Sequence, residues 1–118
     1  MTDIPRQDIS LVRGDDWGPY RWTASTGNLT GCKLWMTLKR SSEDADPGVL
    51  QLDSDGNGIV IVDALNADFE ITAAQAAALP GLPLLYDVQV RTPAGKIYTA
   101  LRGQVFVDTA ADITRTTT

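Results

Sequence analysis

The stretch 84–108 constrains the fold most, because it carries two strand patterns joined by a turn and reads LLYDVQVRTPAGKIYTALRGQVFVD. Apolar and polar residues alternate over 86–91, which is the period of a strand with one buried and one solvated face. Residues 92–95, Thr-Pro-Ala-Gly, then supply the fixed φ of proline and a glycine that tolerates positive φ. The stretch therefore predicts a β-hairpin.

The second strand of this hairpin is expected to have an apolar and a polar face. The apolar face is predicted to carry Ile97, Thr99, Leu101, Val105 and Val107, and the polar face Lys96, Arg102, Gln104 and Asp108. Only Gly103 interrupts this pattern, as a β-bulge or a bend would.

Shorter strand patterns precede the hairpin. Strands are expected over 9–13, 16–24, 32–40, 49–53, 59–62 and 67–71. The strand at 16–24 contains Pro19 and is predicted to lie at a sheet edge, whereas 59–62 is apolar on both faces and is predicted to be central. Thr72 and Gln75 have the spacing of a capping box, which predicts a short helix over 73–79.

Seven or eight short strands with one small helix in a connection predict an all-β fold, namely an immunoglobulin-like antiparallel β-sandwich. Tyr86 begins the second-last strand after a long connection, which is where a tyrosine corner lies in such sandwiches. We expect a flexible N-terminal arm over residues 1–7, the β-sandwich domain over 8–108 and a polar C-terminal tail over 109–118.

Composition argues against several classes of function. The 118 residues include no histidine and one cysteine, Cys32, so the commonest general base, a thiolate metal site and an internal disulfide are all disfavoured. The net charge of −5 disfavours nucleic acid. The N-terminus has no apolar leader, and no run approaches the roughly 18 apolar residues of a membrane span. We therefore expect a non-enzymatic protein without a cofactor, made in a cytoplasm, that binds neither nucleic acid nor membranes.

One weak metal-site candidate lies in the segment 53–58, Asp-Ser-Asp-Gly-Asn-Gly. Asp53, Asp55 and Asn57 match the first oxygen ligands of an EF-hand calcium loop. The position of the bidentate glutamate is Ala64, however, and an apolar strand pattern follows where a helix is required. A plain hairpin turn is the favoured interpretation, because such turns need this composition in any case.

Four aromatic residues are the candidates for binding a partner, namely Trp17, Tyr20, Trp22 and Trp35. Strand alternation places Trp35 opposite Leu34 and Met36, beside two lysines, where it would be an interface anchor. The favoured alternative is that the second layer, or the segment with Trp17, Tyr20 and Trp22, covers it. For the other three aromatics, a core position, a partner contact and a sugar-stacking platform all stay open.

Three stretches together carry a resemblance to a known family: ISLVRGDDW, GCKLWMTLKR, and YDVQVRTPAGKIYTALRGQVFVD with the tail ITRTTT. They resemble small tailed-phage virion proteins with an immunoglobulin-like sandwich, similar to the N-terminal domain of the siphophage baseplate upper protein. The resemblance implies a docking domain without catalytic residues, in a symmetric assembly with other virion proteins. It leaves open whether the chain lies in the tail or baseplate, at the neck or on the capsid surface.

We therefore expect a non-enzymatic structural component of a tailed-phage virion, made in the cytoplasm of the bacterial host. The alternative is a carbohydrate-binding module that uses exposed aromatics to attach to a host-surface glycan.

Overall fold

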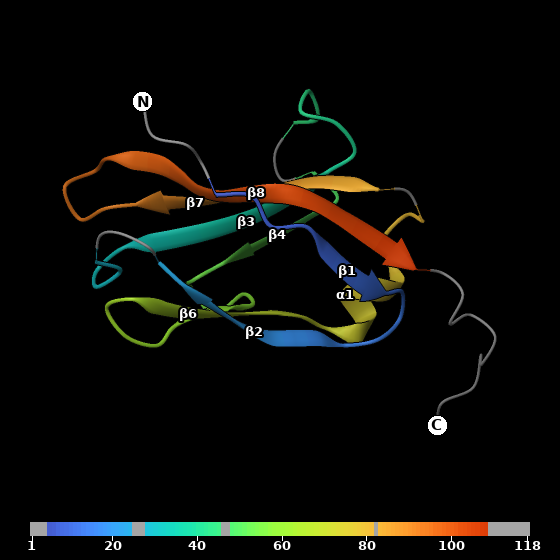
Figure 1. Ribbon diagram of the computed structural model, residues 1–118, viewed down its shortest axis with the longest axis horizontal. Coiled ribbons are helices and arrows are strands. Elements are labelled where there is room, and N and C mark those ends of the chain that lie inside the picture. The colour runs from blue at the N-terminus through green and yellow to red at the C-terminus, as the bar shows by residue number, and fades with distance from the viewer. Residues whose placement is uncertain (1–4, 25–27, 46–47, 82, 109–118) are drawn as a thin grey trace.

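The computed structural model describes residues 5–24, 28–45, 48–81 and 83–108. Within these residues the chain forms eight strands and one short helix, arranged in two layers (Figure 1). The elements are β1 (Ile9–Val12), β2 (Trp17–Thr23), β3 (Lys33–Lys39), β4 (Leu50–Asp53), β5 (Ile59–Ile61), β6 (Asn66–Ile71), α1 (Ala73–Ala77), β7 (Leu84–Arg91) and β8 (Ile97–Asp108). The predicted β-sandwich is confirmed.

Two sheets make up the layers. The larger has five strands in the order β1-β8-β7-β3-β4, and the smaller has three in the order β2-β6-β5. Every neighbouring pair is antiparallel except β1 and β8, which run parallel. Figure 1 shows the five-stranded sheet above the three-stranded sheet, with α1 at one end of the sandwich.

The core lies between the sheets, because alternate residues of each strand point inward. On β7 and β3 the alternation is as predicted, with Val88 and Val90 buried opposite Met36 and Leu34. The three-stranded sheet adds Ile59, Phe69 and Ile71 to the same buried cluster. One face of each sheet is thereby committed to the core, and the opposite face is left for other contacts.

The β7–β8 hairpin forms as predicted, and Gly95 has a φ of +88° in its turn. The irregularity in β8 is at Ala100, and the prediction of a bulge at Gly103 is wrong. Val88 pairs with Leu101 and Gln89 with Thr99, so that Ala100 is an extra residue. The residues before Ala100 therefore change faces, and Ile97 lies on the outer face with 62% of its surface exposed.

The strand β5 lies at the edge of the three-stranded sheet, so the prediction of a central strand over 59–62 is wrong. Ile59 is buried, but Val60 on the opposite face is 62% exposed. An apolar residue on the open face of an edge strand gives the same sequence pattern as a strand buried on both faces. The predicted edge position of β2 is confirmed, and its register shifts between Trp17 and Tyr20, where the Gly18–Pro19 peptide is cis.

Of the arm expected over residues 1–7, Pro5 to Gln7 are held against β8. The Arg102 amide donates to the Pro5 carbonyl at 3.1 Å, and the Gln7 amide donates to the Arg102 carbonyl at 2.9 Å. The Tyr86 hydroxyl also donates to the Gln7 carbonyl, where a tyrosine corner would bond a residue a few positions upstream of the tyrosine. Residues 1–4 and the predicted tail over 109–118 lie outside the described residues.

The helix α1 begins with the predicted capping box. The Gln75 amide donates to Thr72 Oγ1 at 3.2 Å, and the Thr72 amide donates to Gln75 Oε1 at 2.9 Å. The helix ends at Ala77, two residues earlier than expected. It carries the chain from β6 to β7, which means from one sheet to the other.

Candidate functional site

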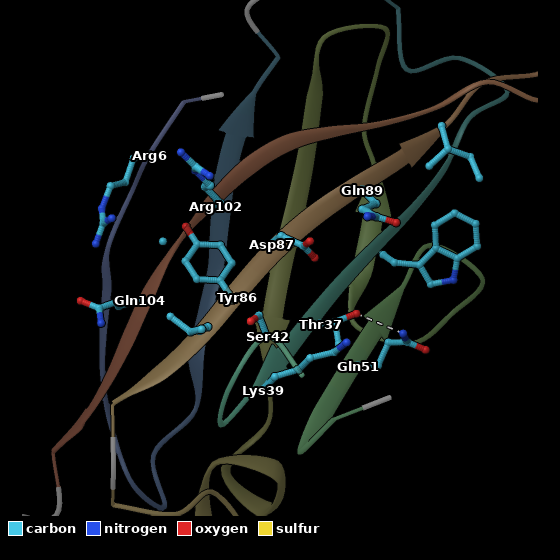
Figure 2. A pocket seen from close by; sticks show the side chains of 14 residues that line it. Arg6, Thr37, Lys39, Ser42, Gln51, Tyr86, Asp87, Gln89, Arg102 and Gln104 are labelled. Carbon is cyan, nitrogen blue, oxygen red and sulfur yellow. Dashed lines mark hydrogen bonds between the residues drawn. The ribbon is translucent and has the colours of Figure 1, made fainter. Parts of the chain in front are cut away.

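The outer face of the five-stranded sheet is hollowed into an open depression of about 800 Å³, which we call the basic concavity. Its polar lining comes mainly from Arg6, Lys39, Gln51, Asp87, Gln89 and Arg102, and its apolar lining from Trp35, Leu85 and Ile97. Figure 2 shows these polar side chains on β3, β4, β7, β8 and the segment before β1. The other face of this sheet packs in the core, so that the outer face is left open, and the sheet is twisted.

Positive charge predominates in this concavity. Arg6, Lys39 and Arg102 line it together with a single carboxylate, Asp87, whereas the whole chain has a net charge of −5. Arg6 and Arg102 lie side by side at one end, because the segment before β1 pairs with β8 at these two residues (Figure 2). Arg6 also contacts Asp8, with 3.4 Å between Nε and Oδ1. The concavity therefore suits a partner with carboxylates or other acceptor groups.

The floor of the concavity is fixed by a cross-strand hydrogen bond. Thr37 is only 8% exposed although it lies on the outer face. Its Oγ1 accepts from Gln51 Nε2 at 3.0 Å, as the dashed line in Figure 2 marks. Both hydrogen-bonding side chains are thereby held in place between β3 and β4.

Trp35 lies on this outer face and is partly exposed, so the second layer does not cover it. The Lys33 ammonium group lies over its ring, 4.9 Å from the ring centre, which is a cation–π geometry. Trp35 pairs with Gln89 on one side and Asp53 on the other. Its ring is thus a partly exposed aromatic surface within the concavity, which is the kind of side chain that anchors interfaces.

The other three aromatic candidates lie on β2, in the opposite sheet, and the structure does not bring them together with Trp35. Trp17 and Trp22 are partly buried and pack against the core. Trp17 stacks on Tyr20 with 5.6 Å between ring centres, and Trp22 meets Phe69 edge to face at 6.2 Å. For Trp17 and Trp22, the geometry favours a core-facing position among the choices that the sequence left open, whereas Tyr20 is placed only by its stacking on Trp17.

The weak metal candidates lie at the end of β4 and in the turn that follows it, where each side chain has another partner. Asp55 Oδ2 is 2.7 Å from the Lys33 ammonium, and Asp53 Oδ1 accepts from the Asp55 amide at 2.9 Å. The Asn57 side chain donates to the Gln51 carbonyl at 3.2 Å. No group of three or more potential metal ligands occurs anywhere in the described residues. The arrangement is that of a hydrogen-bonded hairpin turn.

Around the three-stranded sheet, two carboxylates have lowered pKa values. The Arg21 guanidinium makes a bidentate contact with Asp68, with 3.2 Å between Nη2 and Oδ2, and this hydrogen bonding lowers the pKa of Asp68. The pKa of Asp63 is lowered because its carboxylate accepts from the Leu65 and Asn66 amides and from the Asn66 side chain. Both groups therefore stay ionised and acidic well below neutral pH.

The described residues offer few groups for covalent or acid–base chemistry. Cys32 is buried, and its thiol donates to the Asn28 carbonyl at 3.2 Å. Ser42 lines the basic concavity, but the chain has no histidine to activate it.

No helix among the described residues is both long enough and apolar enough to cross a bilayer. No model of a known protein family matches the chain, and a comparison with curated proteins gives no match. The fold and the site define the chain as a β-sandwich in which polar and apolar side chains line a concavity on one sheet.

Sequence reasoning missed two residues of the concavity, because Arg6 was placed in the flexible arm and Ile97 on the buried face. The strand alternation gave the local signals for the rest of this surface. It correctly assigned to outer faces Trp35, Lys39, Asp87, Gln89, Arg102 and Gln104. The extra residue at Ala100 left no signal in the alternation that could have moved Ile97 to the same face.

Proposed function

We propose that this chain is a non-enzymatic structural component of a tailed-phage virion, in which the basic concavity docks a neighbouring protein. The observation that carries the proposal is the combination in one open depression of the partly exposed Trp35, the exposed Ile97 and paired arginines. No strand or helix of the described residues lies over this face (Figure 1). Aromatic and arginine side chains are the residues that most often carry binding energy in interfaces.

The strand order supports an immunoglobulin-like assignment of the sandwich. In variable-type immunoglobulin domains the strands G, F, C and C′ share one sheet, and B, E and D belong to the other. The neighbours β8, β7, β3 and β4, with β2, β6 and β5 opposite, fit this order. The bond from Tyr86 to Gln7 departs from the usual tyrosine corner, although it ties the same strand to a distant segment.

The sequence resemblance to tailed-phage virion proteins supplies the biological setting of the proposal. The tail or baseplate, the neck and the capsid surface are equally compatible with a small docking sandwich. Synthesis in the cytoplasm of the bacterial host precedes assembly in each case.

The proposal is tested on purified particles of the phage that encodes the chain. Mass spectrometry of the particles should find the chain in a fixed copy number. Electron microscopy of particles assembled without the chain should reveal a missing or altered part, together with reduced infectivity. Intact, infectious particles of otherwise unchanged composition would show that the chain is not a structural component.

A second candidate is a carbohydrate-binding module for host-surface glycans, which is favoured by one observation. Trp35 is an accessible aromatic ring surrounded by side chains that can hydrogen-bond hydroxyl groups, among them Gln51 and Gln89. A glycan array probed with the isolated chain tests this function. Binding that is lost in Trp35→Ala and retained in Trp22→Phe would favour it, since Trp22 packs against the core.

A further inference from the structure

Exposed large apolar side chains fall into two separate groups on the described surface. One group lies on the outer face of the β7–β8 hairpin and consists of Leu85, Ile97 and Phe106, whereas Tyr98 pairs with the buried Val90 and lies on the opposite face of the same sheet. The other lies on β5 and the turn that follows it and consists of Val60, Val62 and Leu65. The two groups belong to different sheets and therefore to different sides of the sandwich. Leu85 and Ile97 line the basic concavity together, and exposed apolar groups rimmed by polar residues are typical of protein–protein contacts.

The charges beside these two groups have opposite signs. The basic concavity, which contains Leu85 and Ile97, is lined by three cations and one carboxylate, with Asp8 as the adjacent carboxylate beside Arg6, a balance of +1. The second group is bordered by Asp63, Asp68 and Glu70, with Arg21 as the one adjacent cation, a balance of −2. We call this second surface the acidic face and define it by Val60, Val62, Asp63, Leu65, Asp68 and Glu70.

Strand pairing places part of the acidic face on the outer side of the three-stranded sheet. Val60 pairs with Asp68, and the inward residues of the same strands are Ile59 and Phe69. Val60, Asp68 and Glu70 also line a second depression, of about 450 Å³. The outer face of the three-stranded sheet thus has apolar groups bordered by carboxylates, and the outer face of the five-stranded sheet has apolar groups bordered mainly by cations.

We propose that copies of this chain associate head to tail, with the basic concavity of one copy against the acidic face of the next. The occupant of the concavity is a second copy because the chain itself supplies a surface complementary in both charge and apolar content. A two-fold contact between two basic concavities would bring cations against cations, which costs free energy. Head-to-tail contacts repeat and close into a ring or extend into a filament.

This inference rests on the proposed function in one respect, namely that a symmetric virion assembly would repeat such a contact. Sedimentation of the purified chain at increasing concentration tests it directly. The wild-type chain should self-associate, and added salt should weaken the association because the facing charges are screened. A chain that stays monomeric from micromolar to millimolar concentration would overturn the proposal.

Two variants remove one face each at matched positions. Ile97→Asp alters the basic concavity and Val60→Asp alters the acidic face, and each original side chain is 62% exposed. Each variant alone should lose roughly tenfold or more of its self-association, because every head-to-tail contact needs both faces. Ala74→Asp, at an exposed position in the first turn of α1, should associate like the wild type. Circular dichroism checks that all three variants fold.

The mixture of the two variants distinguishes a head-to-tail contact from a two-fold contact. Ile97→Asp retains an acidic face and Val60→Asp retains a basic concavity, so that the mixture should form one-to-one dimers that do not grow further. A monomeric mixture, or a loss of association in only one of the two variants, would overturn the proposal. Self-association without incorporation into particles would contradict the proposed function alone, and incorporation of a chain that stays monomeric would contradict this inference alone.

Discussion

Gly103 is the residue on which the attachment of the N-terminal segment depends most. A Cβ atom at this position would lie 2.2 Å from the Gln7 carbonyl oxygen, which is too close for any real contact. Because the obstacle is backbone, relief requires that the Pro5–Gln7 segment move away from β8. The absence of a side chain at this position is therefore what lets the N-terminal segment lie against the sheet.

Replacing Gly103 with alanine tests this dependence. We expect Gly103→Ala to lower the free energy of unfolding by about 1–3 kcal/mol, as overpacked sites do. Trypsin should also cleave after Arg6 faster than in the wild type, because the segment is displaced from β8. Denaturant unfolding and timed proteolysis measure the two effects. Unchanged stability and cleavage would mean that the segment does not pack on β8 in solution.

Tyr86 fastens the same segment through its hydroxyl group, and its burial raises the pKa of the phenol above its usual value. Tyr86→Phe removes the donor to the Gln7 carbonyl and should lower the free energy of unfolding by about 1 kcal/mol at neutral pH.

The pH dependence of Tyr86 follows from the direction of its pKa shift. Since the folded-state pKa is raised, the stabilisation is complete below about pH 10, the pKa of an unfolded tyrosine, and is lost as the pH rises further. Tyr86→Phe should therefore lose stability less steeply above pH 10 than the wild type. Some of the slope should remain, because burial also raises the pKa of Tyr98. Equal slopes in the two proteins would contradict the assigned burial of Tyr86.

Among the elements, β3 carries both the core and the candidate site on alternate residues. Leu34 is completely buried between the sheets, whereas its neighbour Trp35 faces the basic concavity. We expect Leu34→Ala to cost about 2–5 kcal/mol of unfolding free energy, because it opens a cavity in the core. Trp35→Ala should cost about 1 kcal/mol or less, since it removes a cation–π contact and a partly exposed ring. Chemical denaturation compares the two, and equal costs would place Trp35 in the core.

The elements that sequence reasoning predicted well are the strands with one buried face and the helix with a capping box. The alternation in β3 and β7 was decisive because one face of each is buried, and the capping box at Thr72 marked the start of α1 through local hydrogen bonds alone. The sandwich followed from the number and spacing of such strands.

The elements that were predicted wrongly are those in which a local pattern has two structural solutions. The apolar segment 59–62 forms an edge strand of a sheet with only three strands. Its valines are exposed on the outer face, so an apolar pattern on both faces did not mean burial on both faces. Ile97 was assigned to the wrong face because one extra residue, Ala100, reverses the alternation. Neither the edge position of 59–62 nor the outward face of Ile97 can be predicted from neighbouring residues, since both depend on pairing with another strand.

At the scale of the whole molecule, the sandwich separates two surfaces of opposite charge on its two sheets. The chain as a whole is acidic, yet more cations than carboxylates line the basic concavity. This separation is the basis of both proposals, because a docking domain needs an open face and a repeating assembly needs two complementary ones.

The docking role of the basic concavity is tested most directly by incorporation of variants into particles. Chains carrying Ile97→Asp or Ala74→Asp are supplied to assembling particles that lack the wild-type chain, and the amount in purified particles is measured by quantitative mass spectrometry. We expect Ile97→Asp to fold but to be strongly depleted from the particles, whereas Ala74→Asp should be incorporated like the wild type. Incorporation of both variants at the wild-type level would contradict the central claim.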